Sequence, residues 1–439
     1  MNSYYKIKDF NELTQKTVSN SPLASLLTGA ATFSSWNQRS LFAEGYLNNA
    51  IVYRCVQIIA SSVSNLPFLL QKEGVDGKLE DLKNSKNNLY AQFLKKPNPY
   101  TSIVQLVRQA IINYKVGGIA YIQAYRKTDK VIPYELHVLS NQNIQIMQSP
   151  GNYPDELPEA YIYTPVNAAP VTYKVNPVSG RAYATIGNSL TELFRFSDYN
   201  PLDPWQPLSP LTVGGSAVDN HNQATVWNSS LLKQSARPSG FWKSQNRMTE
   251  TQYDQNREIL QSYSGALNAG KSLLLNGDVQ YQQLGLSPVD MDFKNNLEAA
   301  TDLIAASFNI PRQMVLKGES TYNNYATAYE SFYSETVLPL ARLFWKELNN
   351  FLTQDTVYQD IACSIDESVL DALEPKRARR AVRLSQDLKD GKLTLNEARA
   401  QDGLPPYPHA EANMPLIQAG FVPLEDMGLT PNATDLNSL

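Results

Sequence analysis

One stretch of the sequence has the residues and spacing of a phosphate-binding loop. Residues 265–272 read GALNAGKS and match the pattern GxxxxGK(S/T), in which backbone N–H groups and a lysine bind the phosphates of a nucleotide. That chemistry needs a strand before the loop and a helix after it, because the helix N-terminus completes the phosphate site. Here a capping box at Thr249 and Gln252 predicts a helix before the loop, and a β-hairpin is predicted after it. The reversed order favours a helix C-cap at Gly265 and a loop into a strand over a nucleotide site.

Catalytic and metal-binding side chains are sparse and scattered. The three histidines, which have no partners at ligand spacing, are His137, His221 and His409. Asp290 and Asp292 are close in sequence, but on a helix they point to different faces, and acids in a first turn simply complement the helix dipole. We therefore predict no catalytic residue, no cofactor and no metal, and a protein that is not an enzyme.

A run of basic residues follows Pro375 in a stretch with helical character. It comprises Lys376, Arg377, Arg379, Arg380 and Arg383. A solvated helix face is the simpler interpretation, and contact with DNA or acidic neighbours is the alternative. The net charge of the whole chain is −4, whereas tight nucleic-acid binders concentrate an excess of Lys and Arg. If DNA is a partner, we expect this chain to contact it lightly.

Length and composition bound the class of protein. A chain of 439 residues predicts two or three domains, and 42% hydrophobic with 18% charged residues is typical of a folded protein. No stretch approaches the ~20 apolar residues of a membrane-spanning helix, and residues 1–19 are too polar for a secretory signal. The two cysteines, Cys55 and Cys363, are far apart and favour a reducing compartment.

Hydrophobic spacing predicts an α+β region that ends near Asn200. Residues 1–40 are rich in Ser, Asn and Thr and are predicted to be an arm. Apolar residues at helical spacing predict helices at 47–63 and 102–116. Short β-rich runs between turn residues then predict strands at 119–125, 134–139, 144–147, 160–163, 171–175 and 193–196.

The next part of the chain is predicted to hold two long helices with a small unit between them. Ser209 suits an N-cap and Pro210 a first helical position, so a helix is predicted from there to about residue 235. Its centre at 219–223 is too polar for a buried helix, which therefore needs partners from elsewhere, such as neighbouring subunits. The pair Asn276-Gly277 predicts a hairpin of strands at 272–275 and 279–284, and a second helix is predicted at 290–308.

A polar loop and a very long helix follow. The loop at 317–324 leads into a helix of roughly thirty residues, against a usual ~12. Pro339 lies inside that helix and should kink it near Glu335. From about Ser364 the chain is predicted to be helical and charged, and it is rich in proline from Leu404 onward.

A set of short motifs runs through the chain in a fixed order. They are 49–67 with its Leu-Pro end, FLKKPNP at 93–99, GIAY at 118–121, NPLDP at 200–204 with LSPL at 208–211, PSG at 238–240, 274–284, IAASFNIP at 304–311, TVLP at 336–339 and LTLNEAR at 393–399. In order and spacing they resemble the portal proteins of tailed bacteriophages, of the type named after phage HK97. In GIAY, Ile119 replaces the asparagine of the family motif. The resemblance covers about residues 46–410.

This resemblance implies a structural subunit that assembles into a ring. Portals form rings of about twelve identical copies, packed head to tail around an axial channel. The implied partners are double-stranded DNA, the terminase large subunit, and the major capsid and head-completion proteins, with no membrane. The ring would be made in the bacterial host cytoplasm and occupy the portal vertex of the virion, where DNA is packaged and later ejected.

The order of the family's parts implies a layout for this chain. It is an N-terminal arm at 1–40, the first part of a wing at 41–208, a stem helix at 209–235, a clip at 236–288, a second stem helix at 289–310, a tunnel loop at 311–324, the long kinked helix of the wing at 325–360, and a crown with a C-terminal tail at 361–439. The implied fold class is α+β, with an α/β wing, a two-helix stem, a small α/β clip and a helical crown. The GALNAGKS motif falls in the clip.

The resemblance also implies which residues line the narrowest part of the channel. They are Lys317, Gly318, Glu319, Ser320, Thr321, Tyr322, Asn323 and Asn324. A basic lining would hold DNA phosphates tightly and stall a sliding polymer, so the absence of an overall basic charge agrees with passage. A general scaffold or adaptor that does not contact DNA is one rival hypothesis, and rings with a DNA-wide channel would argue against it. The other is a nucleotide-driven motor, which rests on residues 265–272. Lys271→Ala separates a motor from a portal, because a motor would lose ATP turnover and a portal has none to lose.

Overall fold

The structure is a computed structural model, and it describes residues 37–417 apart from 74–78, 83–88, 128–130, 149–157, 202, 204–206, 234–239, 245–248, 263–278, 284–292, 317–321 and 355. The chain divides into two compact units. The first holds Met1–Ala328 and Glu335–Asp366, and the second holds Tyr329–Ser334 and Glu367–Leu439.

The first unit begins with a bundle of short and medium helices. They are α3 (Gln38–Ser40), the π-helical η1 (Leu41–Leu47), α4 (Ala50–Ser64), α5 (Leu89–Lys95) and α6 (Ile103–Gly117). The Asn49 side chain accepts from the first backbone N–H groups of α4, and Ser102 with Gln105 forms a capping box at α6. The helices predicted at 47–63 and 102–116 are thus confirmed. They pack on each other, and each contains fully buried residues, such as Val56 and Ile111.

A seven-stranded antiparallel sheet follows, with the order β4-β3-β9-β8-β7-β6-β5. Its strands are β3 (Ile119–Arg126), β4 (Glu135–Leu139), β5 (Ile144–Gln148), β6 (Pro158–Tyr163), β7 (Val171–Val175), β8 (Ala182–Ile186) and β9 (Ser189–Ser197), with the short 3-10 helix η2 (Asn141–Asn143) between β4 and β5. The six strands predicted from the sequence are confirmed. The sequence prediction missed β8.

This sheet is strongly curled. Strands β3 and β6 are four positions apart in the sheet, which in a flat sheet would separate them by about 19 Å. Yet the rings of Tyr121 on β3 and Tyr161 on β6 have centroids 6.0 Å apart. Gln123 on β3 likewise donates from Nε2 to the hydroxyl of Tyr173 on β7 at 2.6 Å. The concave face therefore closes on its own core, and burial raises the pKa of all three tyrosines.

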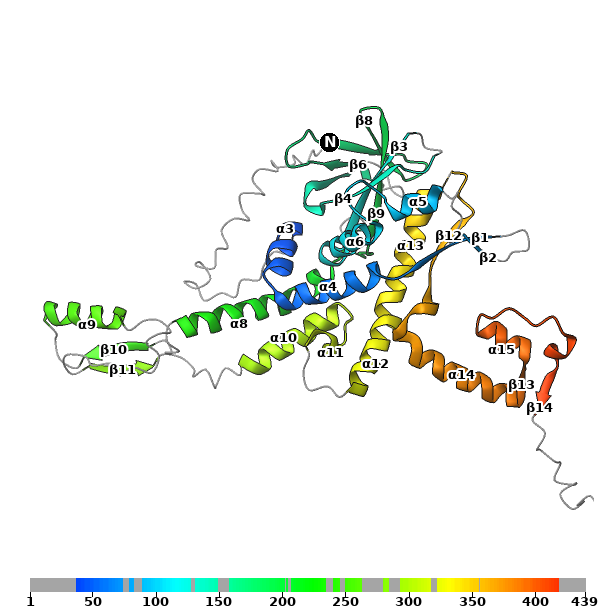
Figure 1. Cartoon of the computed structure of the whole chain (residues 1–439). Coiled ribbons are helices and arrows are strands. Elements are labelled where there is room, and N and C mark those ends of the chain that lie inside the picture. Colours follow the sequence, from blue (N-terminus) through cyan, green and yellow to red (C-terminus); the bar gives the residue numbers. More distant parts are fainter. Residues whose placement is uncertain are drawn as a thin grey trace, which may run out of the picture. The chain divides into compact units, whose positions relative to one another are not determined.

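The other face of the sheet packs against helices. Alternate residues of a strand point to opposite faces, so Phe194 and Phe196 on β9 lie on the outer face. The Phe196 ring lies 4.6 Å from the Tyr114 ring of α6, and both phenylalanines contact rings of helix α13 (Leu338–Thr353). Figure 1 shows α6 and α13 beside this sheet. The sheet therefore fixes α13 along much of its length.

The outer edge of strand β4 is covered by the turn that precedes α6. The Leu136 N–H donates to the Pro97 carbonyl at 2.8 Å, and the Leu136 carbonyl accepts from Asn98 Nδ2 at 2.7 Å. Asn113 of α6 donates to the Leu139 carbonyl at 3.0 Å. These bonds occupy backbone groups that an edge strand would otherwise present to a neighbour.

A smaller three-stranded sheet has the order β12-β1-β2. Its strands are β1 (Phe68–Glu73), β2 (Leu79–Asp81) and β12 (Ile361–Ile365), and Phe68 pairs with Ile365. The Phe68 ring stacks on Trp345 of α13 at 4.6 Å. Residues 361–365 were placed in the helical crown by the sequence prediction. They form a strand of the first unit instead, because their partner β1 lies far away in the sequence.

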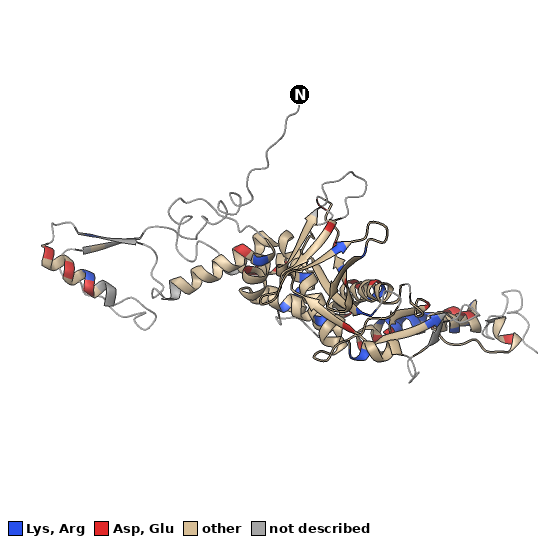
Figure 2. Cartoon of the chain, turned by 90° about the horizontal axis from the view of Figure 1, so that it is seen from above, with Lys and Arg blue, Asp and Glu red and all other residues tan. Residues whose placement is uncertain are grey.

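The predicted helix over residues 209–235 is present but divided. Ser209 accepts from the Leu211 N–H and Pro210 is at the first position, as predicted, for α7 (Pro210–Val213). Gly214 then ends α7, and α8 (Gly215–Lys233) continues. Helix α8 packs on α10 (Phe293–Ser307), which overlaps the helix predicted at 290–308. Figure 2 shows much of α8 without charged residues.

The segment between α8 and α10 contains a helix and a two-stranded sheet among its described residues. Helix α9 (Glu250–Ser262) begins with the predicted pair, since Thr249 and Gln252 exchange side chain to backbone hydrogen bonds. Strand β11 (Val279–Gln283) confirms the second strand of the predicted hairpin, but it pairs with β10 (Gly240–Ser244), which the prediction missed. The first predicted strand, at 272–275, lies outside the described residues.

The long helix is built from three consecutive pieces. The pieces are α12 (Tyr322–Phe332), the π-helical η4 (Tyr333–Val337) and α13. The short helix α11 (Arg312–Val315) precedes the long helix in the sequence. Pro339 has no N–H to bond the Glu335 carbonyl four residues earlier. The kink predicted near Glu335 falls at a π-helical segment, which is a common place for a helix to bend.

The second unit contains the charged helix α14 (Glu374–Lys389), the paired strands β13 (Asp390–Thr394) and β14 (Pro415–Ile417), and α15 (Leu395–Gln401). Among its described residues it also has three short 3-10 segments: η5 (Glu367–Val369), η6 (Asp371–Leu373) and η7 (Ala410–Asn413). Its few buried side chains include Leu373 and Leu384.

Among the helices that the structure describes, none combines the length and apolar character needed to cross a membrane.

Candidate functional site

Several of the predicted site residues lie outside the described part of the chain. They are the GALNAGKS motif at 265–272, the acids Asp290 and Asp292, and the first five channel residues, Lys317, Gly318, Glu319, Ser320 and Thr321. For the motif, the described neighbours keep the predicted order, with helix α9 before it and strand β11 after it.

The last three predicted channel residues belong to a helix and not to a loop. Tyr322, Asn323 and Asn324 form the first turn of α12. Asn is a weak helix former, which is why the sequence predicted a loop there. Of the candidate channel residues 317–324, the structure thus describes only those that begin α12.

A polar contact holds the long helix at its π-helical segment. Asn309 ends α10 in the left-handed conformation, with φ of 54°. Its Nδ2 donates to Thr336 Oγ1 at 3.0 Å, and the Thr336 hydroxyl donates to the Asn309 carbonyl at 2.6 Å. Thr336 lies in η4, so the end of α10 is joined to the irregular point of the long helix.

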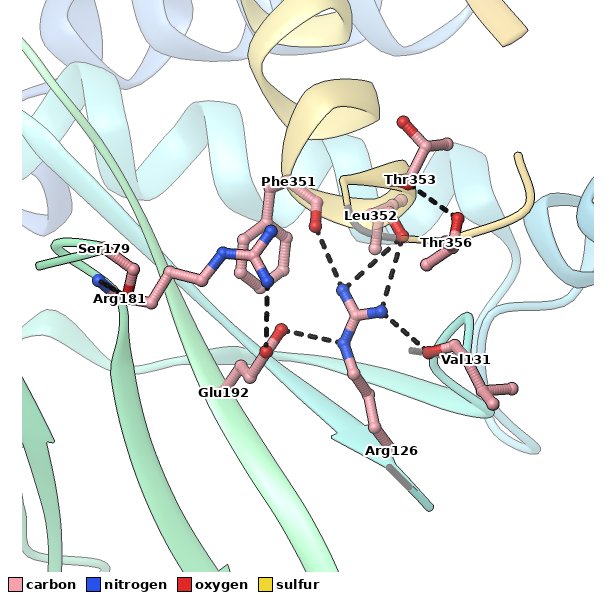
Figure 3. Close-up of polar contacts among 9 residues, drawn as sticks. All are labelled: Arg126, Val131, Ser179, Arg181, Glu192, Phe351, Leu352, Thr353 and Thr356. Atoms are coloured by element: carbon pink, nitrogen blue, oxygen red, sulfur yellow. Dashed lines mark hydrogen bonds and ion pairs between the residues drawn. The ribbon is translucent and has the colours of Figure 1, made fainter. Parts of the chain in front are cut away.

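A buried arginine holds the other end of the long helix (Figure 3). Arg126 on β3 donates from Nε to Glu192 Oε2 on β9 at 2.7 Å, and both side chains are fully buried. Its Nη2 donates to the Phe351 carbonyl at 3.0 Å, and its Nη1 donates to the carbonyls of Val131 at 2.8 Å and Leu352 at 3.4 Å. The last carbonyls of a helix have no partner within it, so the guanidinium supplies one at the C-terminus of α13.

Charge also favours this arrangement, which we call the arginine clamp (Arg126, Glu192, Arg181 and Phe351). A cation at a helix C-terminus complements the helix dipole. Arg181 adds a second cation, with Nη1 3.5 Å from Glu192 Oε1 and its guanidinium carbon 6.0 Å from the centre of the Phe351 ring. Burial lowers the pKa of Arg126, and the Glu192 carboxylate opposes that shift. The sequence reasoning missed the clamp, because single charged residues on strands usually face solvent.

Most basic residues of the predicted basic face on α14 bond other residues of the second unit. Arg377 bonds the Glu374 carboxylate and the carbonyls of Glu367 and Leu370. The other contacts made by this face are Arg379 with Glu330 and Arg380 with the Gln401 carbonyl. Lys376 and Arg383 are exposed and are not seen to bond other described residues. These contacts favour a structural role for three of the five cations, and they leave few for DNA or acidic neighbours.

The three histidines lie in different surroundings. His137 on β4 has Nε2 3.0 Å from Glu135 Oε2, His409 precedes η7, and His221 lies on α8. Within the described ranges, no group of His, Cys, Asp or Glu has the arrangement of a metal site.

His221 takes part in a joint between α4 and α8. Asn49 is buried, and its Oδ1 accepts from the N–H groups of Ile51 and Val52 at 3.0 Å. Its Nδ2 must therefore donate, and it faces His221 Nδ1 at 3.2 Å and Asn222 Oδ1 at 2.9 Å. His221 Nδ1 can accept that bond only when it carries no proton. Burial lowers the pKa of His221, which agrees with a neutral ring.

We expect this joint to weaken in acid. The pKa of His221 is lower in the folded chain than in the unfolded chain. The neutral His221 ring therefore stabilises the fold fully above the unfolded-state pKa of about 6.5, and this stabilisation is lost as the pH falls through the folded-state pKa. The ring is only half-buried, so the loss should be below about 1 kcal/mol. His221→Asn keeps an acceptor near Nδ1 but cannot titrate, so thermal unfolding of this variant should change less than wild type between pH 7 and pH 5. Equal pH dependence in the two proteins would contradict the prediction.

A family model and related sequences match most of the chain. The model described as "Phage portal protein" matches residues 50–403. A protein of Rickettsia felis is 28% identical over 368 residues, which cover 83% of this chain and 88% of that protein. The portal protein of Escherichia phage T5 is 26% identical over 165 residues, which cover 37% of this chain and 38% of that protein.

Solved structures are similar over a comparable length. A chain in the neck of a native gene transfer agent particle, computed with C12 symmetry, is 26% identical with a TM-score of 0.60, and the match covers 88% of this chain and 99% of that chain. An HK97 family phage portal protein from Corynebacterium diphtheriae is 12% identical with a TM-score of 0.50, covering 77% and 97% of the two chains, and this likeness concerns the fold alone.

Proposed function

The chain belongs to the phage portal protein family, and from this premise we propose that about twelve copies of it form a closed ring at one vertex of a capsid, around a channel for double-stranded DNA. The predicted portal-type α+β fold is confirmed by the similar portal and neck structures. The observation that carries the ring is the likeness, along nearly the whole of that chain, to a subunit of a particle neck computed with C12 symmetry.

Within this proposal the protein guides DNA and docks other proteins, and it catalyses no reaction. The partners are the terminase large subunit, which drives DNA inward, and the major capsid and head-completion proteins. The ring is made in the host cytoplasm and stays in the virion. Its parts follow the layout given above, except that the crown begins at Glu367, where the second unit takes over from strand β12.

The channel segment is the five residues 317–321 together with the first turn of α12. The charge of the chain supports passage with little friction, since its net value is −4 and DNA phosphates meet no overall basic excess. A surface that neither attracts nor strongly repels phosphates lets a charged polymer slide.

Negative-stain electron microscopy of the purified chain, with light scattering for mass, tests the proposal. We expect rings of about a dozen copies with a central hole wide enough for a DNA duplex. Monomers that persist at high concentration and low salt would contradict ring formation by the chain alone. The same preparation should show no ATP turnover, and Lys271→Ala should leave that result unchanged.

A further inference from the structure

Helix α14 has an outer face that is rich in cations. Its inner side carries Leu384, which is buried, and Arg377, which bonds two backbone carbonyls of the second unit. At about 3.6 residues per turn, six exposed side chains fall together on the other half of the helix. They are Lys376, Arg379, Val382, Arg383, Gln386 and Lys389. We call this surface the α14 outer face.

The charge of this face is not balanced by the helix itself. Helix α14 has six Lys or Arg residues and only two acids. Lys376 and Arg383 are exposed and are not seen to bond other described residues, and their spacing of seven residues places them about 10 Å apart along the helix. Val382 lies beside them and is 71% exposed. A segment that fits this face therefore carries acidic groups together with apolar ones.

The chain after β14 starts beside the end of this helix. Strand β14 packs on α14, and its last residue, Ile417, pairs with Asp390, the first residue after the helix. Because β14 is antiparallel to β13, it runs toward α14. Eight residues separate Ile417 from Glu425, and they span about 26 Å when extended. That exceeds the roughly 21 Å along α14 between Asp390 and Lys376, so Glu425 can reach this lysine.

The residues after β14 have the composition that the α14 outer face needs. Residues 418–439 lie outside the described part of the chain, and we call them the acidic tail, because they hold three acids and no Lys, Arg or His. The acids are Glu425, Asp426 and Asp435, and the first two lie among Phe421, Val422, Leu424 and Met427. Attachment to β14 keeps the local concentration of the tail high at any protein concentration.

We infer that the acidic tail binds the α14 outer face of its own chain, with Glu425 and Asp426 against Lys376 and Arg383 and the apolar neighbours of these acids on Val382. The bound tail occupies cations that would otherwise hold DNA phosphates, so it screens this helix from DNA. That effect on DNA rests on the proposed function, whereas the contact itself does not, because it forms within one chain.

Zero-length cross-linking of the full chain tests the contact. A carbodiimide joins a carboxylate to a lysine amine in contact with it, and mass spectrometry then identifies the joined peptides. We expect Lys376 to be joined to Glu425 or Asp426. Arg383→Glu should lower the yield about two- to five-fold, which is the effect of one exposed ion pair. Arg383→Glu combined with Asp426→Arg should restore the yield, because the exchanged charges again attract.

A matched control and isotope labelling complete the experiment. Arg54→Glu makes the same change of charge on an exposed residue of α4 and should leave the yield unchanged. Chains grown in light and in heavy nitrogen are mixed before assembly, and the joined peptides should be both light or both heavy. Pairs of mixed isotope would place the tail on another copy and overturn the contact within one chain.

Two further results would also overturn the inference. One is a tail whose acids join only Lys389 and Lys392, the lysines nearest to the start of the tail. The other is a Lys376 that never joins the tail and is protected from amine-reactive reagents by a DNA duplex, which would assign the α14 outer face to DNA. A wild-type chain that forms no rings would overturn the proposed function, and the cross-link at Lys376 would still decide the contact.

Discussion

Replacement of Arg126 by Met is expected to lower the free energy of unfolding by about 3–5 kcal/mol, because it leaves the Glu192 carboxylate buried with a weaker partner. Arg126 and Glu192 have no exposed side-chain surface, so water cannot take the place of the lost cation. The carbonyls of Val131, Phe351 and Leu352 lose their donor at the same time. Chemical denaturation followed by far-UV circular dichroism measures the change.

Two control variants separate the charge from the packing. Arg126→Met combined with Glu192→Leu removes both charges, and it should recover most of the loss, leaving about 1 kcal/mol for the unpaired carbonyls. Arg181→Met should cost much less than Arg126→Met, since Arg181 lies 3.5 Å from Glu192 and makes the weaker contact. A loss below about 1 kcal/mol for Arg126→Met would show that the clamp does not hold α13.

Deletion of residues 317–321 is expected to leave rings intact and to reduce DNA packaging close to background. On the proposed function this segment lines the narrowest part of the channel, so its loss should change the path of the DNA and not the contacts between copies. The measurement is the amount of nuclease-protected DNA in particles that contain the variant, with electron microscopy of the rings beside it.

A replacement of the same five residues by Gly and Ser keeps the length of the connection between α11 and α12. It shows whether shortening this connection strains the start of the long helix. Like the deletion variant, it should form rings. If it packages DNA normally, the length of the segment matters and its side chains do not. Normal DNA packaging by the deletion variant would contradict the assignment of these residues to the channel.

The sequence predicted elements whose signals are local. Ser102, Ser209 and Thr249 each mark a helix start through a bond to a backbone group two or three residues away, and all three are confirmed. Strand β7 was predicted with its observed bounds because turn residues lie on both sides. Contacts between residues so close in sequence can be predicted without the fold of the rest of the chain.

Features that depend on distant residues could not be predicted in this way. Strand β12 forms because Ile365 pairs with Phe68, and nothing near Ile365 indicates that partner. The arginine clamp likewise joins β3, β9 and the end of α13, and each of its charged residues by itself resembles a surface residue. The polar composition of residues 317–324 predicted a loop at the candidate channel segment. Tyr322, Asn323 and Asn324 instead belong to α12, where they form the first turn of the long helix.

The covered edge of β4 has a consequence for a protein that works in many copies. A bare edge strand can extend its sheet with a strand from another molecule, which leads to aggregates of no fixed size. With the Leu136 backbone already bonded to Pro97 and Asn98, this edge cannot recruit a neighbour in that manner. At this edge, contacts between copies must then come from side chains, whose shapes fit only particular partners.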